Sequence, residues 1–132
     1  MALPAGVSAD SIRAVYENTK RPDAVSRIAS AANTTNATLA KNGPGAVFAI
    51  SGYNAAASVR YLKLYNKASA PAVGTDVPFA TIALQATAAF NPNLCGLSFS
   101  TGIAYALTTG AADNDTGALT AADVVGLSIT YA

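Results

Sequence analysis

The chain lacks most of the side chains that carry enzyme chemistry. Its 132 residues include no histidine, no tryptophan and one cysteine, and only 11% of them are charged. The absence of histidine excludes Ser-His-Asp and Cys-His pairs and any imidazole metal site. Glu17 is the only glutamate, so a paired-glutamate site is excluded, and no glycine-rich phosphate loop with its lysine is present. We therefore expect a protein that is not an enzyme and that uses no cofactor and no metal.

The single cysteine, Cys95, excludes an internal disulfide framework. We expect it to be a small buried residue, with an intermolecular disulfide or a reactive thiol as the alternatives. No apolar run approaches the roughly 18 residues of a membrane span, and the first residues lack the basic and apolar regions of a signal peptide. No membrane association is expected, and the default is a cytosolic product or a particle assembled there.

Charge is scarce and unevenly placed. Residues 1–67 hold all eight basic residues and three acidic ones, whereas residues 68–132 hold four acidic residues and no basic one. Such halves can attract each other within the fold or between subunits. The positive charge of the first half is too dilute to demand nucleic acid, which is not an expected partner. So little charge suits a protein that neighbours largely cover.

Short alternating segments separated by Gly, Pro and Asn turns dominate the chain from residue 24 onward. Seven or so such segments, with no strong helical pattern among them, predict an all-β fold, an antiparallel β-sandwich of the jelly-roll-like kind. The residues expected on core faces are Phe48, Ile50, Leu62, Leu64, Ile82, Leu84, Leu97, Phe99, Ile103, Tyr105, Leu107, Val125, Leu127, Ile129 and Tyr131. The Pro/Gly-rich residues 67–78 are a candidate crossover between the two sheets.

The first part of the chain reads differently from the rest. Residues 1–32 are predicted to form an N-terminal arm, and residues 33–132 the sandwich domain. Apolar residues in the arm have helical spacing up to Pro22, but so short a helix is marginal alone. The arm then needs a partner surface to become ordered, with a frayed tail as the alternative. Arg13 and Tyr16 are its candidate interface residues.

The most distinctive local feature is a stripe of alternating tyrosine and lysine, which lies opposite the core face of its strand. Tyrosines can stack bases or sugars, and lysines can neutralise phosphates, so single-stranded nucleic acid and carbohydrate are conceivable ligands. A protein interface or a solvated sheet face is the interpretation we favour, because tyrosine is common at interfaces and few basic residues lie nearby. The stripe consists of Tyr61, Lys63, Tyr65 and Lys67.

An acidic segment, residues 113–123, resembles a calcium-binding loop in its alternating oxygen-bearing residues. Hard cations prefer such ligands. However, its glycine comes one position early for an EF-hand, and no glutamate closes the loop. We interpret it as a polar loop between strands.

Two long blocks resemble a known group of proteins. They are GYNAAASVRYLKLYNKASAPAVGTDVPFATIAL, residues 52–84, and STGIAYALTTGAADNDTGALTAADVVGLSITYA, residues 100–132. Both look like a family of short structural proteins of tailed bacteriophages, and the resemblance covers about residues 44–132. It implies a virion protein with a β-sandwich exposed on the particle.

Within that family resemblance, capsid decoration (cement) proteins are similar in size and character. This similarity implies that the chain binds the major capsid protein or other virion proteins. It also implies a homo-oligomer, with a trimer favoured, and a location in the virion after assembly in the host cytoplasm. A tail, collar or fibre component, or a glycan-binding module on the virion surface, remains the alternative.

Overall fold

The computed structural model describes residues 5–6, 8, 22–30 and 32–132. This described part contains nine strands and no helix, which confirms the predicted all-β class. Within the same residues, no helix has the length and apolar character that a membrane crossing needs. The strands are β1 (Ala24–Ile28), β2 (Thr38–Asn42), β3 (Gly45–Asn54), β4 (Arg60–Asn66), β5 (Ala80–Leu84), β6 (Ala88–Phe90), β7 (Asn93–Phe99), β8 (Gly102–Thr108) and β9 (Val124–Tyr131).

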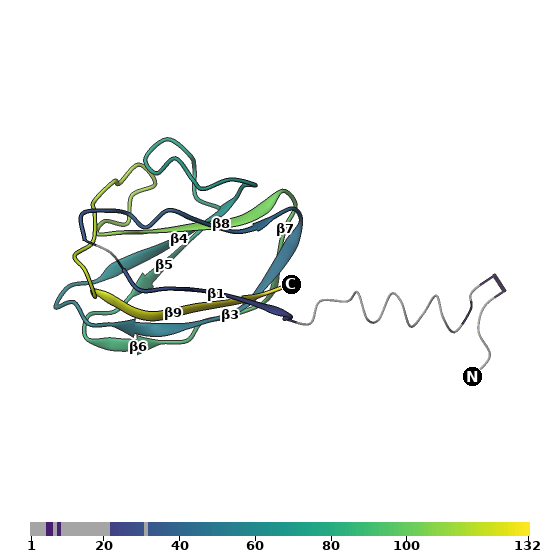
Figure 1. The fold of residues 1–132 in the computed structure, drawn as a ribbon, viewed down its shortest axis with the longest axis horizontal. Helices are drawn as coiled ribbons and strands as arrows, with labels where there is room; N and C mark the ends of the chain where they lie inside the picture. The colour runs from purple at the N-terminus through teal and green to yellow at the C-terminus, as the bar shows by residue number, and fades with distance from the viewer. Residues whose placement is uncertain (1–4, 7, 9–21, 31) are drawn as a thin grey trace.

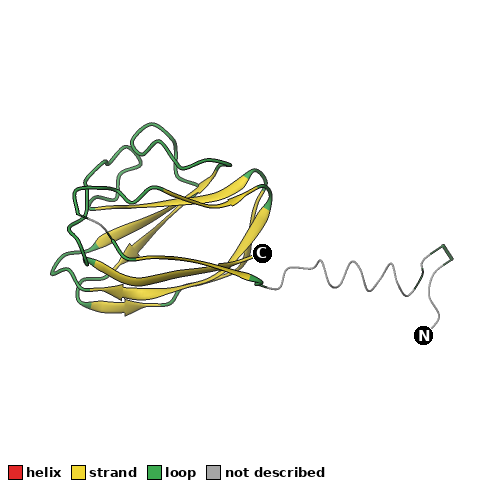
Figure 2. Cartoon of the chain, viewed as in Figure 1, coloured by secondary structure: helices red, strands yellow, loops and turns green. Residues whose placement is uncertain are grey.

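The strands form two antiparallel sheets that pack face to face. One sheet has the order β1-β9-β3-β6, with β7 also paired to β3, and the other has the order β2-β8-β4-β5. In Figure 1 they are the lower and upper layers of a sandwich. Figure 2 shows long loops above the upper layer, whereas no long loop crosses the outer side of the lower layer. The two outer faces of the sandwich are therefore not equivalent.

The strand pairing follows one simple rule when β6 and β7, which both pair with β3, are counted as one strand. Each of the eight described strands then pairs with its counterpart counted from the other end. β1 pairs with β9, β2 with β8, β4 with β5, and β3 with both β6 and β7. These pairs are then joined through β3 with β9 and through β4 with β8. A long antiparallel hairpin rolled into two sheets in this way is a jelly roll. The jelly-roll-like sandwich predicted from the sequence is therefore confirmed.

The core lies between the inner faces of the two sheets. The predicted core residues of β4, β5 and β8 are buried or packed against the buried cluster, as alternation requires. Tyr105 spans the layers, because its Oη lies 2.8 Å from Ser26 Oγ in β1. The fully buried large side chains of the core are Ile50, Leu62, Leu64, Leu84, Phe99, Ile103, Tyr105, Leu107, Leu119 and Leu127.

Two bulges shift the core positions of β3 and β9 away from plain alternation. In β3, Val47 pairs with Tyr131 and Ala49 with Thr130, so Phe48 is an extra residue. The buried residues are consequently Val47 and Ile50, and the prediction that Phe48 shares the core with Ile50 is wrong, since Phe48 is only half-buried.

The second bulge lies in β9 at Gly126, whose φ of 63° is in the left-handed region. The register with β3 shifts between Ser51 and Tyr53 at this point. Val124 is therefore buried and Val125 is 45% exposed, which overturns the prediction that Val125 lies in the core.

Predictions about two connections are also corrected. Residues 97–109 alternate without a break in the sequence, but they form the end of β7 and all of β8, which lie in different sheets. Both strands direct their apolar residues to the core. Residues 67–78, a candidate crossover, instead return to the same sheet, because β4 and β5 are antiparallel neighbours.

The sandwich begins earlier than the predicted boundary between residues 32 and 33. β1 lies within the predicted arm and pairs with β9 along its whole length. The Asp23 N–H also donates to the Tyr131 carbonyl at 3.0 Å, so the sheet begins beside the end of β9 (Figure 1). Arg13 and Tyr16, the candidate interface residues of the arm, lie outside the described residues.

The bulge at Gly126 makes a stability prediction. Val124→Ala removes buried apolar volume and is expected to lower the free energy of unfolding by about 1.5–3 kcal/mol. Val125→Ala, the matched control, is expected to change it by less than about 0.5 kcal/mol, because the side chain is already exposed. Urea unfolding of the two variants measures the difference. Equal losses, or a larger loss at Val125, would contradict the position of the bulge.

Candidate interaction surface

The tyrosine–lysine stripe of β4 is covered by the chain itself. Lys63 is 0% exposed and Tyr65 is 1% exposed, whereas Tyr61 and Lys67 are partly exposed. Tyr65 packs with Ala104 and Ala106 of β8 and with Val73 from the loop after β4, forming a small second cluster outside the main core. A solvated sheet face, one of the two interpretations favoured from the sequence, is therefore excluded for Lys63 and Tyr65.

Lys63 fastens the loop between β8 and β9 to the outer face of the sheet. Its Nζ donates to the carbonyl of Ala112 at 2.5 Å and to that of Asp115 at 3.4 Å. The Asp115 carboxylate in turn accepts the N–H groups of Gly110 and Gly117, at 3.1 and 2.8 Å, and so closes the loop on itself. An ammonium removed from water needs such acceptors, so the loop that covers Lys63 also supplies them.

Lys67 fastens the loop between β4 and β5 in a similar way. Its Nζ lies 2.5 Å from Asp76 Oδ2, and the same oxygen accepts the N–H of Ala72 at 2.7 Å. The hydrogen bond from Lys67, with that from Ala72, holds the pKa of the Asp76 carboxyl below its ordinary value. This loop carries Val73 onto Tyr65.

Both ion pairs of the described residues join the basic first half of the chain to the acidic second half. Lys67 pairs with Asp76, and Arg60 Nε lies 2.9 Å from Asp123 Oδ2. Pairing within the fold, one of the two arrangements left open by the charge distribution, is therefore present.

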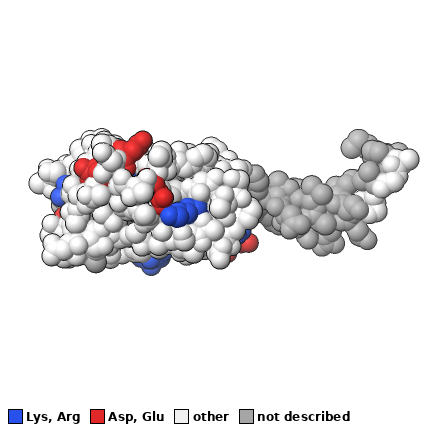
Figure 3. All heavy atoms as spheres, turned by 90° about the horizontal axis from the view of Figure 1, so that it is seen from above, with Lys and Arg blue, Asp and Glu red and all other residues white. Residues whose placement is uncertain are grey.

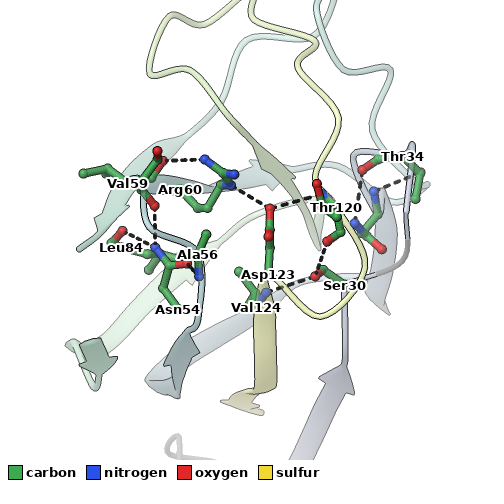
Figure 4. A network of polar contacts seen from close by, with 12 residues as sticks. Ser30, Thr34, Asn54, Ala56, Val59, Arg60, Leu84, Thr120, Asp123 and Val124 are labelled. Atoms are coloured by element: carbon green, nitrogen blue, oxygen red, sulfur yellow. Dashed lines mark hydrogen bonds and ion pairs between the residues drawn. The ribbon is translucent and has the colours of Figure 1, made fainter. Parts of the chain in front are cut away.

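Asp123 is the centre of a polar network at one end of the sandwich (Figure 4). Besides Arg60, it accepts the N–H of Thr120 at 3.1 Å. Ser30 Oγ donates to the Thr120 carbonyl at 3.2 Å, and Asn54 Nδ2 donates to the Leu84 carbonyl at 2.9 Å. These bonds run between the connections at this end and hold them together, so we interpret the network as a structural clamp.

Tyr65 carries a polar group that its own fold leaves without a partner. Its buried hydroxyl makes no hydrogen bond to any described residue. Burial raises the pKa of the phenol, and the carboxylates of Asp76 and Asp113 raise it further. Tyr65 therefore stabilises the loop-covered outer face of the β2-β8-β4-β5 sheet by packing, whereas burial of its unpartnered hydroxyl lowers the free energy of unfolding.

Cys95 and the acidic loop complete the residues singled out from the sequence. Cys95 is exposed, so the prediction that it is buried is wrong. It has a φ of 52° beside Gly96, where β7 bulges against β3, and this conformation turns the side chain outward. The described residues contain no group of three or more His, Cys, Asp or Glu side chains placed to hold a metal ion.

The outer face of the β1-β9-β3-β6 sheet is the open face of the sandwich. Rows of residues cross it in register: Val25, Thr130 and Ala49 form one row, and Arg27, Ser128 and Ser51 form the next. A third row is formed by Val125, Tyr53 and Ala89. We call these nine residues the bare face.

The bare face combines exposed apolar side chains with little charge. Val25, Tyr53 and Val125 are 56%, 39% and 45% exposed. Arg27 is the only charged residue in the five strands of this sheet. Figure 3, which looks onto the opposite, loop-covered side, shows acidic and basic side chains gathered there instead. Sequence alternation alone did not single out this face, because the bulges at Phe48 and Gly126 break its pattern.

The role of Lys63 makes a prediction about the covered face. Lys63→Met keeps most of the stem but removes the donor for two loop carbonyls, and is expected to cost about 1–3 kcal/mol of unfolding free energy. Lys67→Met, the control, loses a partly exposed ion pair and is expected to cost no more than about 1 kcal/mol. Chemical unfolding compares them. A Lys63→Met variant as stable as the wild type would show that Lys63 does not hold the loop.

The two buried tyrosines predict opposite responses to removal of the hydroxyl. Tyr65→Phe removes an unpartnered polar group and is expected to leave stability unchanged or raise it by up to about 1 kcal/mol. Tyr105→Phe breaks the bond with Ser26 and is expected to lower stability by about 1 kcal/mol or more. Thermal unfolding of both variants tests this. A loss at Tyr65 equal to that at Tyr105 would contradict the assignment.

Comparisons with known proteins give no further site residue. Protein-family models, curated proteins and solved structures were each compared with the chain, and none matches it. The candidate surface is therefore defined by the residues and geometry above.

Proposed function

We propose that the chain is a structural protein of a bacteriophage virion, in which it serves as a capsid decoration (cement) protein. Its bare face would lie against the major capsid protein or another virion protein and strengthen the shell. The observation that carries the proposal is the difference between the two outer faces. One is closed by the chain's own loops, and the other presents apolar side chains on a sheet with a single charge.

The physical chemistry of the bare face favours burial by a protein. Removing charged groups from water is costly unless they are paired, and the nine residues of the bare face include a single charged one, Arg27. Tyr53 stands among small side chains, and a tyrosine of this kind contributes contact area with a polar tip, as interface tyrosines commonly do. Tyr53 and Val125 lie directly opposite each other, and adjacent exposed apolar residues on a folded domain commonly mark such contacts.

The fold and the sequence resemblance support the same proposal. Jelly rolls occur in viral capsid proteins and in lectins, although a fold alone does not determine a function. The two blocks that resemble phage structural proteins contain most of the upper layer and all of β9. Contacts that are repeated over a shell add through avidity, so each single contact of the bare face can be weak.

The alternatives differ in how well the side chains support them. A tail, collar or fibre component would use the same bare face and is the second candidate. A glycan-binding or nucleic-acid-binding module that uses the stripe is not favoured, because Lys63 and Tyr65 are buried beneath the loops. The proposed location is the virion, and the proposed mechanism requires no cofactor.

Co-sedimentation with purified particles produced without this chain tests the proposal. The wild-type chain is expected to sediment with the particles. A Tyr53→Lys/Val125→Lys variant places charge on the bare face and is expected to bind at least about tenfold more weakly, as loss of central interface contacts does.

Val77→Lys is the matched control, because Val77 is 74% exposed but lies in the loop before β5. It is expected to bind like the wild type. Failure of the wild-type chain to sediment with particles would contradict the virion role. Binding of the Tyr53/Val125 variant at wild-type strength would contradict the choice of face.

A further inference from the structure

The free edge of β1 carries an inference that does not depend on the proposed function. β1 ends the order of its sheet, with β9 as its one strand neighbour in the described chain. Its other edge therefore presents backbone N–H and C=O groups to any strand that lies beside it. Asp23, Val25 and Arg27 are exposed, whereas the residues between them face inward, so these three share the outer side.

The charges on this edge are arranged to match a second copy of the same strand. We propose that two copies pair through their β1 strands, antiparallel and about a two-fold axis at Val25. Val25 then lies opposite Val25 of the second copy, because a two-fold axis places equal residues together. Asp23 lies opposite Arg27 of the second copy, and Arg27 lies opposite its Asp23.

The register is specified by these side chains. Directly opposite residues on an antiparallel pair lie on the same face with Cβ atoms roughly 4.5–5.5 Å apart, close enough for ion pairs. A shift of two residues in either direction separates both Asp–Arg pairs, and a shift of one places an outer side chain opposite an inner one. Neither Asp23 nor Arg27 has an ion pair with another described residue, so both charges are available.

The other edge strands of the described chain lack this pattern. β2 contains a single charge, Lys41, while β5, β6 and β7 contain none. The residue before Asp23 is Pro22, which has no N–H and ends the ladder opposite Ile28 of the second copy. A shallow depression lined by Arg27, Ile28, Ala29, Val125 and Gly126 lies at that end of β1 and would receive Pro22.

Pairing of this kind would join two bare faces into one. The axis is perpendicular to the sheet, so the outer residues of both copies lie on the same side. A five-residue strand pair is smaller than a standard stable interface, so the pair is expected to be weak and to form at high protein concentration. It is a two-fold pair, which distinguishes it from the trimer implied by the family resemblance.

Charge reversal tests the pairing in the full-length chain, in low salt and without particles, by sedimentation equilibrium. The wild type is expected to form dimers. Asp23→Arg and Arg27→Asp each place like charges opposite each other twice, and each is expected to weaken the dimer about tenfold or more. The double variant restores opposite charges and is expected to restore the dimer, which a merely destabilised fold would not do.

A second measurement reports on the register. Val25→Cys in a Cys95→Ser background is expected to form a disulfide-linked dimer on mild oxidation, whereas Val77→Cys in the same background is not. A monomeric wild type at all concentrations, single variants that dimerise like the wild type, or a double variant that stays monomeric would each overturn the proposal. None of these outcomes bears on particle binding, which the Tyr53/Val125 variant tests separately.

Discussion

The buried ammonium of Lys63 is the constraint on which the rest of the surface depends. A fully buried lysine needs oxygen acceptors, and the loop between β8 and β9 provides them through the carbonyls of Ala112 and Asp115. That loop, together with the one held by Lys67 and Asp76, closes one outer face of the sandwich. Of the two outer faces formed by the described strands, the face of the β1-β9-β3-β6 sheet is the one that remains open to a partner.

Scarce charge has a different meaning once the fold is known. Two of the basic residues pair with aspartates of the second half, and Lys63 is engaged by loop carbonyls. Among the described residues, these charges hold loops of the chain in place. Apart from Arg27, the bare face consists of apolar residues, serines and a threonine, and such a surface is suited to burial against another protein.

Much of the fold follows from period-two alternation in the sequence. Leu62 with Leu64, and Ile103 with Leu107, lie in the core because neighbouring residues of a strand point to opposite faces. Alternation fails at Phe48 and Gly126, because one extra residue in a strand exchanges inner and outer positions beyond it. Only the glycine itself signals the second bulge in the sequence, and nothing in the sequence signals the first.

The candidate site was harder to predict for a related reason. Alternation correctly placed Lys63 and Tyr65 opposite the core face, but it cannot show what covers that face. The cover comes from loops distant in sequence, through contacts such as that of Val73 with Tyr65. The sequence does not predict Asp23 and Arg27 as interface residues, because the segment that forms β1 alternates weakly. The free edge of β1 becomes evident only from the order of strands in the sheet.

A density map of the intact particle tests the central claim most directly, because it shows which side of the sandwich a neighbour touches. The account predicts density of another virion protein against the strands β1, β9 and β3, with the loops above β4 and β8 facing away. A neighbour seated on the loop-covered side, or particles that lack this chain altogether, would contradict it.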